Sequence, residues 1–112
     1  MELSVLDDDR VRMVAELGGT EFLRHLATVF AEQARGKMGE IRAAVQAGNL
    51  EAVRLEAHKI HGSALNIGAL RVAHVARQLE AVTTAPEELG PLAEALHTEV
   101  ESAAAQLAAF EP

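Results

Sequence analysis

The stretch that decides the fold is Leu50–Ala64, LEAVRLEAHKIHGSA, which has the apolar spacing of an amphipathic helix. Its apolar residues recur every three or four positions and therefore share one side of a helix; they are Leu50, Val53, Ala57, Ile60 and Ala64. Gly48 and Asn49 come just before it, and an Asn side chain is well suited to cap a first helical turn. We therefore expect a helix over residues 50–64 with one buried face.

A short leading helix is predicted near the N-terminus, over residues 7–17. Three apolar residues in it have the spacing of a common inward face; they are Val11, Val14 and Leu17. The acidic residues Asp7 to Asp9 favour its first turn, because negative charge is stabilised at a helix N-terminus. Gly18 and Gly19 follow and are expected to stop this helix.

Three further helices are predicted on either side of residues 50–64. A long one begins at Thr20, a suitable N-cap, and ends near Ala47. Its apolar residues are expected to form one buried stripe; they include Phe22, Leu26, Val29, Phe30, Ile41 and Val45. Two more helices are predicted over residues 69–83 and 88–109. Residues 83–91, which hold two prolines and a glycine, are expected to be a loop or a frayed helix start.

Composition supports an all-α protein with a single core. Hydrophobic residues make up 49% of the 112 residues and aromatic residues only 3%, so Ala, Leu, Val and Ile must build the core. Ala and Leu are strong helix formers, and few segments alternate with the period of a strand. Short connections between amphipathic helices favour antiparallel neighbours. We predict an up-and-down antiparallel four-helix bundle, capped by the short N-terminal helix, as one domain over residues 1–112.

Several classes of protein are disfavoured by the sequence. It contains no cysteine, which excludes disulfides and thiolate metal sites. It has neither the start of a secretory signal nor an apolar run of the roughly 20 residues that cross a bilayer. We expect a cytoplasmic protein without a membrane partner. The net charge of −7 argues against nucleic acid, but residues 24–77 hold eight basic and four acidic side chains, so this central part suits an anionic partner.

His58 is the candidate for chemistry. On a helix with about 100° per residue it falls about 120° from the centre of the buried stripe, so its ring should reach solvent. Gly62 lies one turn further on, without a side chain to obstruct an approach. An imidazole with the usual pKa of about 6.5 is a competent nucleophile at cellular pH. The sequence has no nucleotide-binding loop and no paired metal carboxylates near His58, so we expect no ATP-dependent kinase activity and no cofactor of its own.

The block 57–69 resembles the signature of the histidine-containing phosphotransfer (HPt) family, A-H-x-[LI]-K-G-[SA]-[SA]-x-x-[LIF]-G-A. The resemblance extends to an apolar series ending in Leu-Glu, and it also covers the long helix and the break before the histidine helix; the residues concerned are Val72, Ala76, Leu79, Glu80, Phe30, Gly48 and Asn49. It implies that His58 accepts a phosphoryl group. It also implies response-regulator receiver domains and a hybrid histidine kinase as partners, with Mg²⁺ supplied by the receiver.

The same resemblance implies a docking surface, and one position departs from the pattern. The family usually has Lys three residues after the acceptor, where this chain has His61, while a Lys stands at Lys59. Either stabilisation of the phosphate is weaker in this chain, or His61 becomes cationic beside the phosphate and supports it together with the flexible Lys59. We expect the second. Docking is expected on the exposed flank of the long helix and the histidine helix; the further candidates are Lys37, Arg54, Leu55, Gly62, Ser63 and Leu65. We expect a monomer.

Two other functions are compatible with parts of the sequence. One is metal binding, since His58 and His61 are one turn apart and Glu94 precedes His97 by three residues. A di-iron bundle needs two Glu-x-x-His pairs and two more carboxylates, so we expect no metal site. The other is a docking module of the same fold that transfers no phosphate. His25, His74 and His97 are interpreted as ordinary surface or boundary residues.

Overall fold

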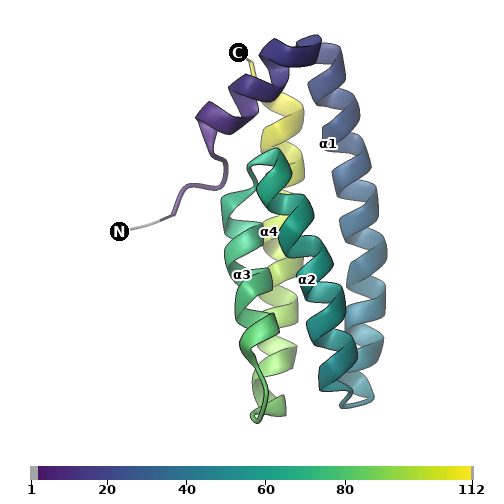
Figure 1. Cartoon of the computed structure of the whole chain (residues 1–112). Helices are drawn as coiled ribbons and strands as arrows, with labels where there is room; N and C mark the ends of the chain where they lie inside the picture. Colours follow the sequence, from purple (N-terminus) through teal and green to yellow (C-terminus); the bar gives the residue numbers. More distant parts are fainter. Residues whose placement is uncertain (1–2, 112) are drawn as a thin grey trace.

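The computed structural model describes residues 3–111, which form an all-helical bundle without β-strands in that range. Each helix packs against the next along the chain, and the last packs back against the first, so the helices run alternately up and down (Figure 1). The elements are α1 (Asp8–Gln46), α2 (Leu50–Ile67), α3 (Leu70–Ala81), the 3₁₀ turn η1 (Pro86–Glu88) and α4 (Leu89–Ala109). The predicted fold class is confirmed.

The first part of α1 crosses the end of the bundle as the predicted capping helix (Figure 1). The change of direction is at Gly19, the one residue inside α1 with non-helical angles (φ 86°, ψ 171°). A positive φ of this kind favours glycine, because a Cβ clashes there. The sequence therefore located the break correctly. Thr20, the predicted N-cap of the long helix, already has helical angles, so the boundary residue is Gly19 and this prediction is wrong by one residue. The leading helix is capped by Asp7, whose Oδ1 accepts from the Arg10 N–H at 3.2 Å.

Two predicted core residues beside this break are exposed. Leu17 is 80% exposed to solvent and Phe22 is 42% exposed. Leu23 is fully buried in place of Phe22. Phe30 and Ile41 are buried as predicted, so the difference is confined to the start of the stripe, where the Phe22 ring packs against Gly18 beside the kink. After the kink the buried residues of α1 are Leu23, Ala27, Phe30, Ala31, Ala34, Met38, Ile41 and Ala44.

The end of α2 is tied to the N-terminal segment. The helix runs three residues further than predicted and ends at Gly68, whose φ is 82°. The Gly68 carbonyl accepts from the Asp7 N–H at 2.8 Å, and the Leu70 N–H donates to the Val5 carbonyl at 2.9 Å. A Cβ at Gly68 would stand 3.2 Å from the Cβ of Arg10, so glycine also allows this close approach. The capping helix is thereby fixed on the turn between α2 and α3.

The core is aliphatic, as predicted, and it positions α2 rigidly. One face of α2 is buried by Val53, Ala57, Ile60, Ala64 and Ile67. The Asn49 side chain caps the helix, its Oδ1 accepting from the Ala52 N–H at 3.1 Å, which confirms the predicted cap. Among the described residues, no helix has both the length and the apolar character for crossing a membrane.

Candidate functional site

His58 projects from the solvent side of α2. Its side chain is 67% exposed, whereas its neighbours Ala57 and Ile60 are buried in the core. Three other residues share its face at helical spacing: Leu55, Gly62 and Leu65, all exposed. No atom lies within 4 Å of where a Cβ of Gly62 would stand. The predicted exposure of the imidazole beside an unobstructed stretch of helix is therefore present.

The His58 ring is oriented by Glu80, which comes from α3. Nδ1 of His58 lies 2.7 Å from Oε1 of Glu80. An ionised carboxylate only accepts hydrogen bonds, so Nδ1 carries the ring proton and donates it to Glu80. In the neutral imidazole the other nitrogen, Nε2, then holds the lone pair. The carboxylate thus selects the tautomer in which the nucleophilic nitrogen is free.

His61 lies on the other side of the same carboxylate. Its Nδ1 is 3.0 Å from Oε2 of Glu80, and its ring centroid is 6.3 Å from that of His58. This close pair is not aligned as a hydrogen bond, and Oε2 of Glu80 is buried without a hydrogen-bond partner. His61 and Glu80 are mostly buried, with 20% and 18% of their side-chain surfaces exposed. Glu80 therefore stands between two imidazoles at the edge of the core.

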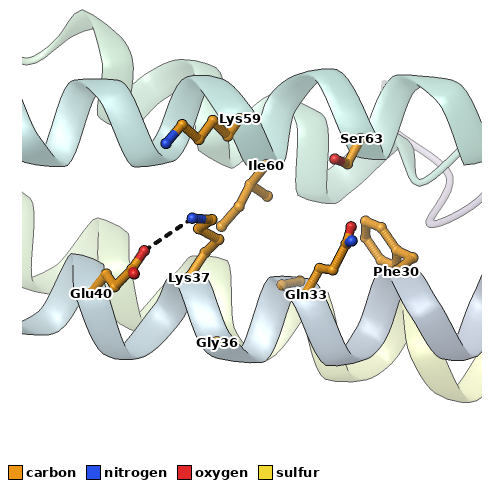
Figure 2. Close-up of a pocket in the computed structure, with 9 residues that line it drawn as sticks. Phe30, Gln33, Gly36, Lys37, Glu40, Lys59, Ile60 and Ser63 are labelled. Atoms are coloured by element: carbon orange, nitrogen blue, oxygen red, sulfur yellow. Dashed lines mark hydrogen bonds and ion pairs between the residues drawn. The ribbon is translucent and has the colours of Figure 1, made fainter.

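Lys59 points to a different flank of α2 from His58. Its Nζ lies 3.3 Å from Oε1 of Glu56, while Nζ of Lys37 on α1 lies 3.0 Å from Oε2 of the same carboxylate. Lys37 also binds Glu40 at 3.1 Å, as Figure 2 shows. Burial by itself would raise the pKa of Glu56, but the lysine hydrogen bonds outweigh it and hold this pKa below its usual value. Both lysines are therefore engaged in ion pairs, and the pair between Lys37 and Glu56 joins α1 to α2.

The flank with the two lysines contains a groove between α1 and α2. Its volume is about 490 Å³, and its floor includes Ile60 and Phe30, with Gln33 extending toward α2 (Figure 2). Gly36 leaves one wall open, since no atom lies within 4 Å of the place of a Cβ there. Ser63, which was predicted from sequence to be part of the docking surface, lines this groove. The groove therefore lies along one edge of the exposed surface of α2, and His58 lies along the other.

Comparison with known proteins identifies the family. The sequence profile of the Hpt domain matches residues 25–110. This chain belongs to the Hpt domain family. It also resembles the crystal structure of histidine-containing phosphotransfer protein B (HptB) from Pseudomonas aeruginosa PAO1, with a TM-score of 0.85 and 25% sequence identity, over 95% of this chain and 93% of that one. A search of curated proteins finds no match. The predicted family is confirmed, and with it a role in histidine phosphotransfer within two-component phosphorelays.

The exposed face of this Hpt domain combines apolar and basic side chains. Leu55 is 46% exposed and Leu65 is 51% exposed, one on each side of His58 and Gly62 along α2. Arg54 is ion-paired with Glu51 in the same helix, which raises the pKa of its guanidinium. The residues predicted for docking are therefore accessible, but they lie on two flanks of α2, with Lys37 and Lys59 on the groove side.

Glu80 is the residue of this Hpt domain that sequence reasoning did not assign to the site. It was noted only as the last residue of the apolar series that ends in Leu-Glu. The available signal was its position directly after the buried Leu79, which puts a carboxylate at the margin of the core. Only the packing of α3 against α2 brings it to His58. The structure therefore adds an acidic residue to a site that the sequence described as histidine and lysine alone.

Proposed function

We propose that His58 is the phosphoryl-accepting residue of this Hpt domain and that it relays the group between aspartates of receiver domains. One observation carries the proposal: the His58 ring is exposed, and its Nδ1 is held by Glu80 while Nε2 is free. Of the five histidines, His58 alone combines the family motif with this arrangement. His61 is mostly covered, and His25, His74 and His97 lie outside the motif.

The proposed step is a direct transfer between oxygen and nitrogen. Nε2 of His58 attacks the phosphorus of an aspartyl phosphate, the new P–N bond forms, and the P–O bond to the aspartate breaks, releasing its carboxylate. The imidazole becomes cationic as the bond forms, and its Nδ1 proton remains shared with Glu80. A carboxylate placed beforehand at the point where positive charge develops lowers the barrier. The reverse sequence delivers the group to the next receiver, and Mg²⁺ in the receiver neutralises phosphate charge.

The receiver is proposed to dock over the exposed side of α2. Leu55 and Leu65 supply apolar contacts, and Gly62 lets the partner's backbone approach the ring. Lys37 and Lys59 on the groove flank supply positive charge for an acidic receiver pocket. A surface of a few apolar residues with complementary charge suits a transient complex that releases its partner quickly.

The proposal includes four further expectations from the sequence. His61 and Lys59 support the phosphoryl group, a hybrid histidine kinase supplies it, and the protein is a monomer located in the cytoplasm. Lys59 reaches the phosphate only if its ammonium leaves Glu56, to which it is bound at 3.3 Å. His61 needs a smaller movement, because it already adjoins the His58 ring. We therefore assign the larger share of phosphate support to His61.

The test is phosphoryl transfer from a purified receiver. The protein is incubated with a ³²P-labelled phosphoreceiver and Mg²⁺, and the label is expected to appear on the protein in an acid-labile, base-stable form. His58→Gln should abolish labelling, while His74→Gln on the exposed side of α3 should not. If His58→Gln binds phosphoreceivers and the wild type never takes up label, the chain is a docking module and the proposed relay is wrong.

A further inference from the structure

Three potential metal ligands meet at the site without a metal-binding motif in the sequence. His58, His61 and Glu80 each offer one donor atom, and these atoms all lie within 4.8 Å of one another. Two of the ligands come from α2 and the third from α3. The donor set, two imidazoles and one carboxylate, is one that Zn²⁺ uses in proteins.

We propose that His58, His61 and Glu80 form a binding site for Zn²⁺, and that zinc bound there switches off phosphoryl acceptance by His58. The metal site itself does not depend on the proposed function. Only its effect on transfer rests on that function. The ion would take three protein ligands and leave a fourth position open to water, as three-ligand zinc sites do.

The distances around Glu80 suit this ion after a small adjustment. Nδ1 of His58 and Nδ1 of His61 lie 2.7 and 3.0 Å from the two Glu80 oxygens. Tetrahedral zinc with bonds of about 2.0–2.1 Å holds its donors about 3.3 Å apart, so the His58 pair needs to open by about 0.6 Å and the His61 pair by about 0.3 Å. The His58 side chain is exposed enough to move by that amount, and the other two are fixed by the edge of the core.

A second observation favours a cation at this place. Oε2 of Glu80 is buried and has no hydrogen-bond partner among the described residues. Nδ1 of His61 lies 3.0 Å away but is not aligned to donate to it, so the loss of water on burial is incompletely compensated. Zinc between Oε2 and the imidazole of His61 would supply that partner. Of the three ligands, His58 is the one exposed to solvent, with 67% of its side-chain surface accessible.

Zinc on Nδ1 would remove the nucleophile. A neutral imidazole has one N–H, and the nitrogen that binds a metal must be the one without the proton. When Nδ1 of His58 binds zinc, the ring proton moves to Nε2, which loses its free lone pair. Glu80 selects the reactive tautomer in the metal-free protein, and zinc selects the opposite one. Bound zinc and attack on phosphorus by Nε2 are therefore mutually exclusive.

Binding is tested first on the unphosphorylated protein without any receiver. Isothermal titration with ZnCl₂ should show one zinc per chain, and Glu80→Gln, His61→Gln and His58→Gln should each weaken binding by more than about tenfold, the lower bound for losing even an outer partner of a zinc ligand. His97→Gln is the matched control, since His97 belongs to the Glu-x-x-His pair on α4. The proposal would be overturned if the wild type showed no saturable zinc binding, or if all three site variants bound zinc as tightly as the wild type.

A spectroscopic test locates the ion independently of affinity. Long-range ¹H–¹⁵N spectra of the imidazoles should show zinc-dependent shifts at Nδ1 of His58 and His61, with the proton of His58 now on Nε2. The histidines at positions 25 and 74 should not respond. Shifts at His97 instead, or a His58 proton that stays on Nδ1 with zinc bound, would overturn the assignment.

The effect on transfer is measured last, as the ratio of rates with and without zinc for each variant. Saturating zinc should abolish labelling of the wild type, and a chelator should restore it. In His61→Gln the ratio should approach one at the same zinc concentration, whatever the basal rate of that variant. A zinc effect that persists in His61→Gln would place the inhibition in the receiver and overturn the switch. Failure of transfer without zinc would instead refute the proposed function and leave the binding result standing.

Discussion

The Glu80 carboxylate on α3 lies 2.7 Å from Nδ1 of His58 on α2, so the exposed imidazole is oriented by a residue 22 positions away in the sequence. That contact meets two requirements of a phosphoryl-accepting histidine at once. The ring must be open to a partner's pocket, and its reactive nitrogen must be in the correct protonation state. Because the carboxylate holds only the inner nitrogen, the outer nitrogen keeps its lone pair on the exposed side of the ring.

Glu80→Gln should slow phosphoryl acceptance without weakening receiver binding. The amide retains the size of the side chain but not the charge that opposes the developing imidazolium. Hydrogen bonds to charged groups contribute about 1.5–3 kcal/mol, so the maximal single-turnover rate should fall by about tenfold or more. Glu87→Gln, in the exposed η1 turn, is the control and should react like the wild type. An unchanged maximal rate would mean that Glu80 does not assist the reaction.

Gly62→Gln should weaken receiver docking while leaving the fold intact. A Cβ at this position meets no other part of the domain within 4 Å, beyond its chain neighbours and the backbone of its own helix. Gln is a better helix former than Gly, so the free energy of unfolding should be unchanged or higher by up to about 1 kcal/mol. The added side chain projects beside His58, so transfer should need a higher receiver concentration. Gly90→Gln on α4 is the matched control, and equal transfer by both variants would show that the receiver docks elsewhere.

Gly68→Ala should destabilise the domain more than Gly48→Ala does. Both glycines have positive φ, 82° and 65°, where a Cβ costs about 1–2 kcal/mol. Only at Gly68 does the Cβ also meet neighbouring atoms, the Arg10 side chain at 3.2 Å and the Asp7 carbonyl at 3.3 Å. Urea unfolding of the two variants separates the backbone cost, which they share, from the contact of the capping helix. An equal decrease in the free energy of unfolding of both variants would show that the capping helix shifts to accommodate the Cβ at no measurable free-energy cost.

The sequence predicted the features that depend on helical periodicity and on chain breaks. The exposure of His58 followed from its angle to the buried stripe of α2, and the break near Gly19 followed from the glycine pair. Periodicity is a local property, so these predictions needed no knowledge of how the helices pack. The Asn49 cap was predictable for the same reason, since it involves only the first turn of α2.

The errors concern the relation between one segment and another. Phe22 was predicted to be buried in place of Leu23, because a sequence pattern does not reveal that the Phe22 ring packs against Gly18 beside the kink. Glu80 escaped assignment because its proximity to His58 depends on how α3 lies against α2. The flank of Lys59 was given by its angle on the helix, and its ion pair with Glu56 lies within α2, whereas the ion pair between Lys37 and Glu56 depends on the position of α1.

Arg35→Gln should lower stability near neutral pH and have no effect in acid. Arg35 on α1 binds Glu101 on α4 through two hydrogen bonds of 2.8 Å, and these hydrogen bonds with the Arg35 charge hold the pKa of Glu101 below its usual value of 4.5. A carboxyl whose pKa is lower in the folded state stabilises the fold above its unfolded pKa, and this contribution is lost as the pH falls through the folded pKa. The difference in free energy of unfolding between wild type and Arg35→Gln should therefore be constant above about pH 5–6, shrink below the unfolded value of 4.5, and vanish once Glu101 is protonated in both states.

Urea titrations at several pH values and low ionic strength measure this difference, since salt screens exposed pairs. Arg12→Gln is the control, because its partner Asp9 is fully exposed, lies at 3.5 Å and belongs to the same helix, so its loss should change stability little at any pH. An Arg35→Gln effect that persists at acid pH would have to come from packing of the arginine stem rather than from the ion pair between α1 and α4.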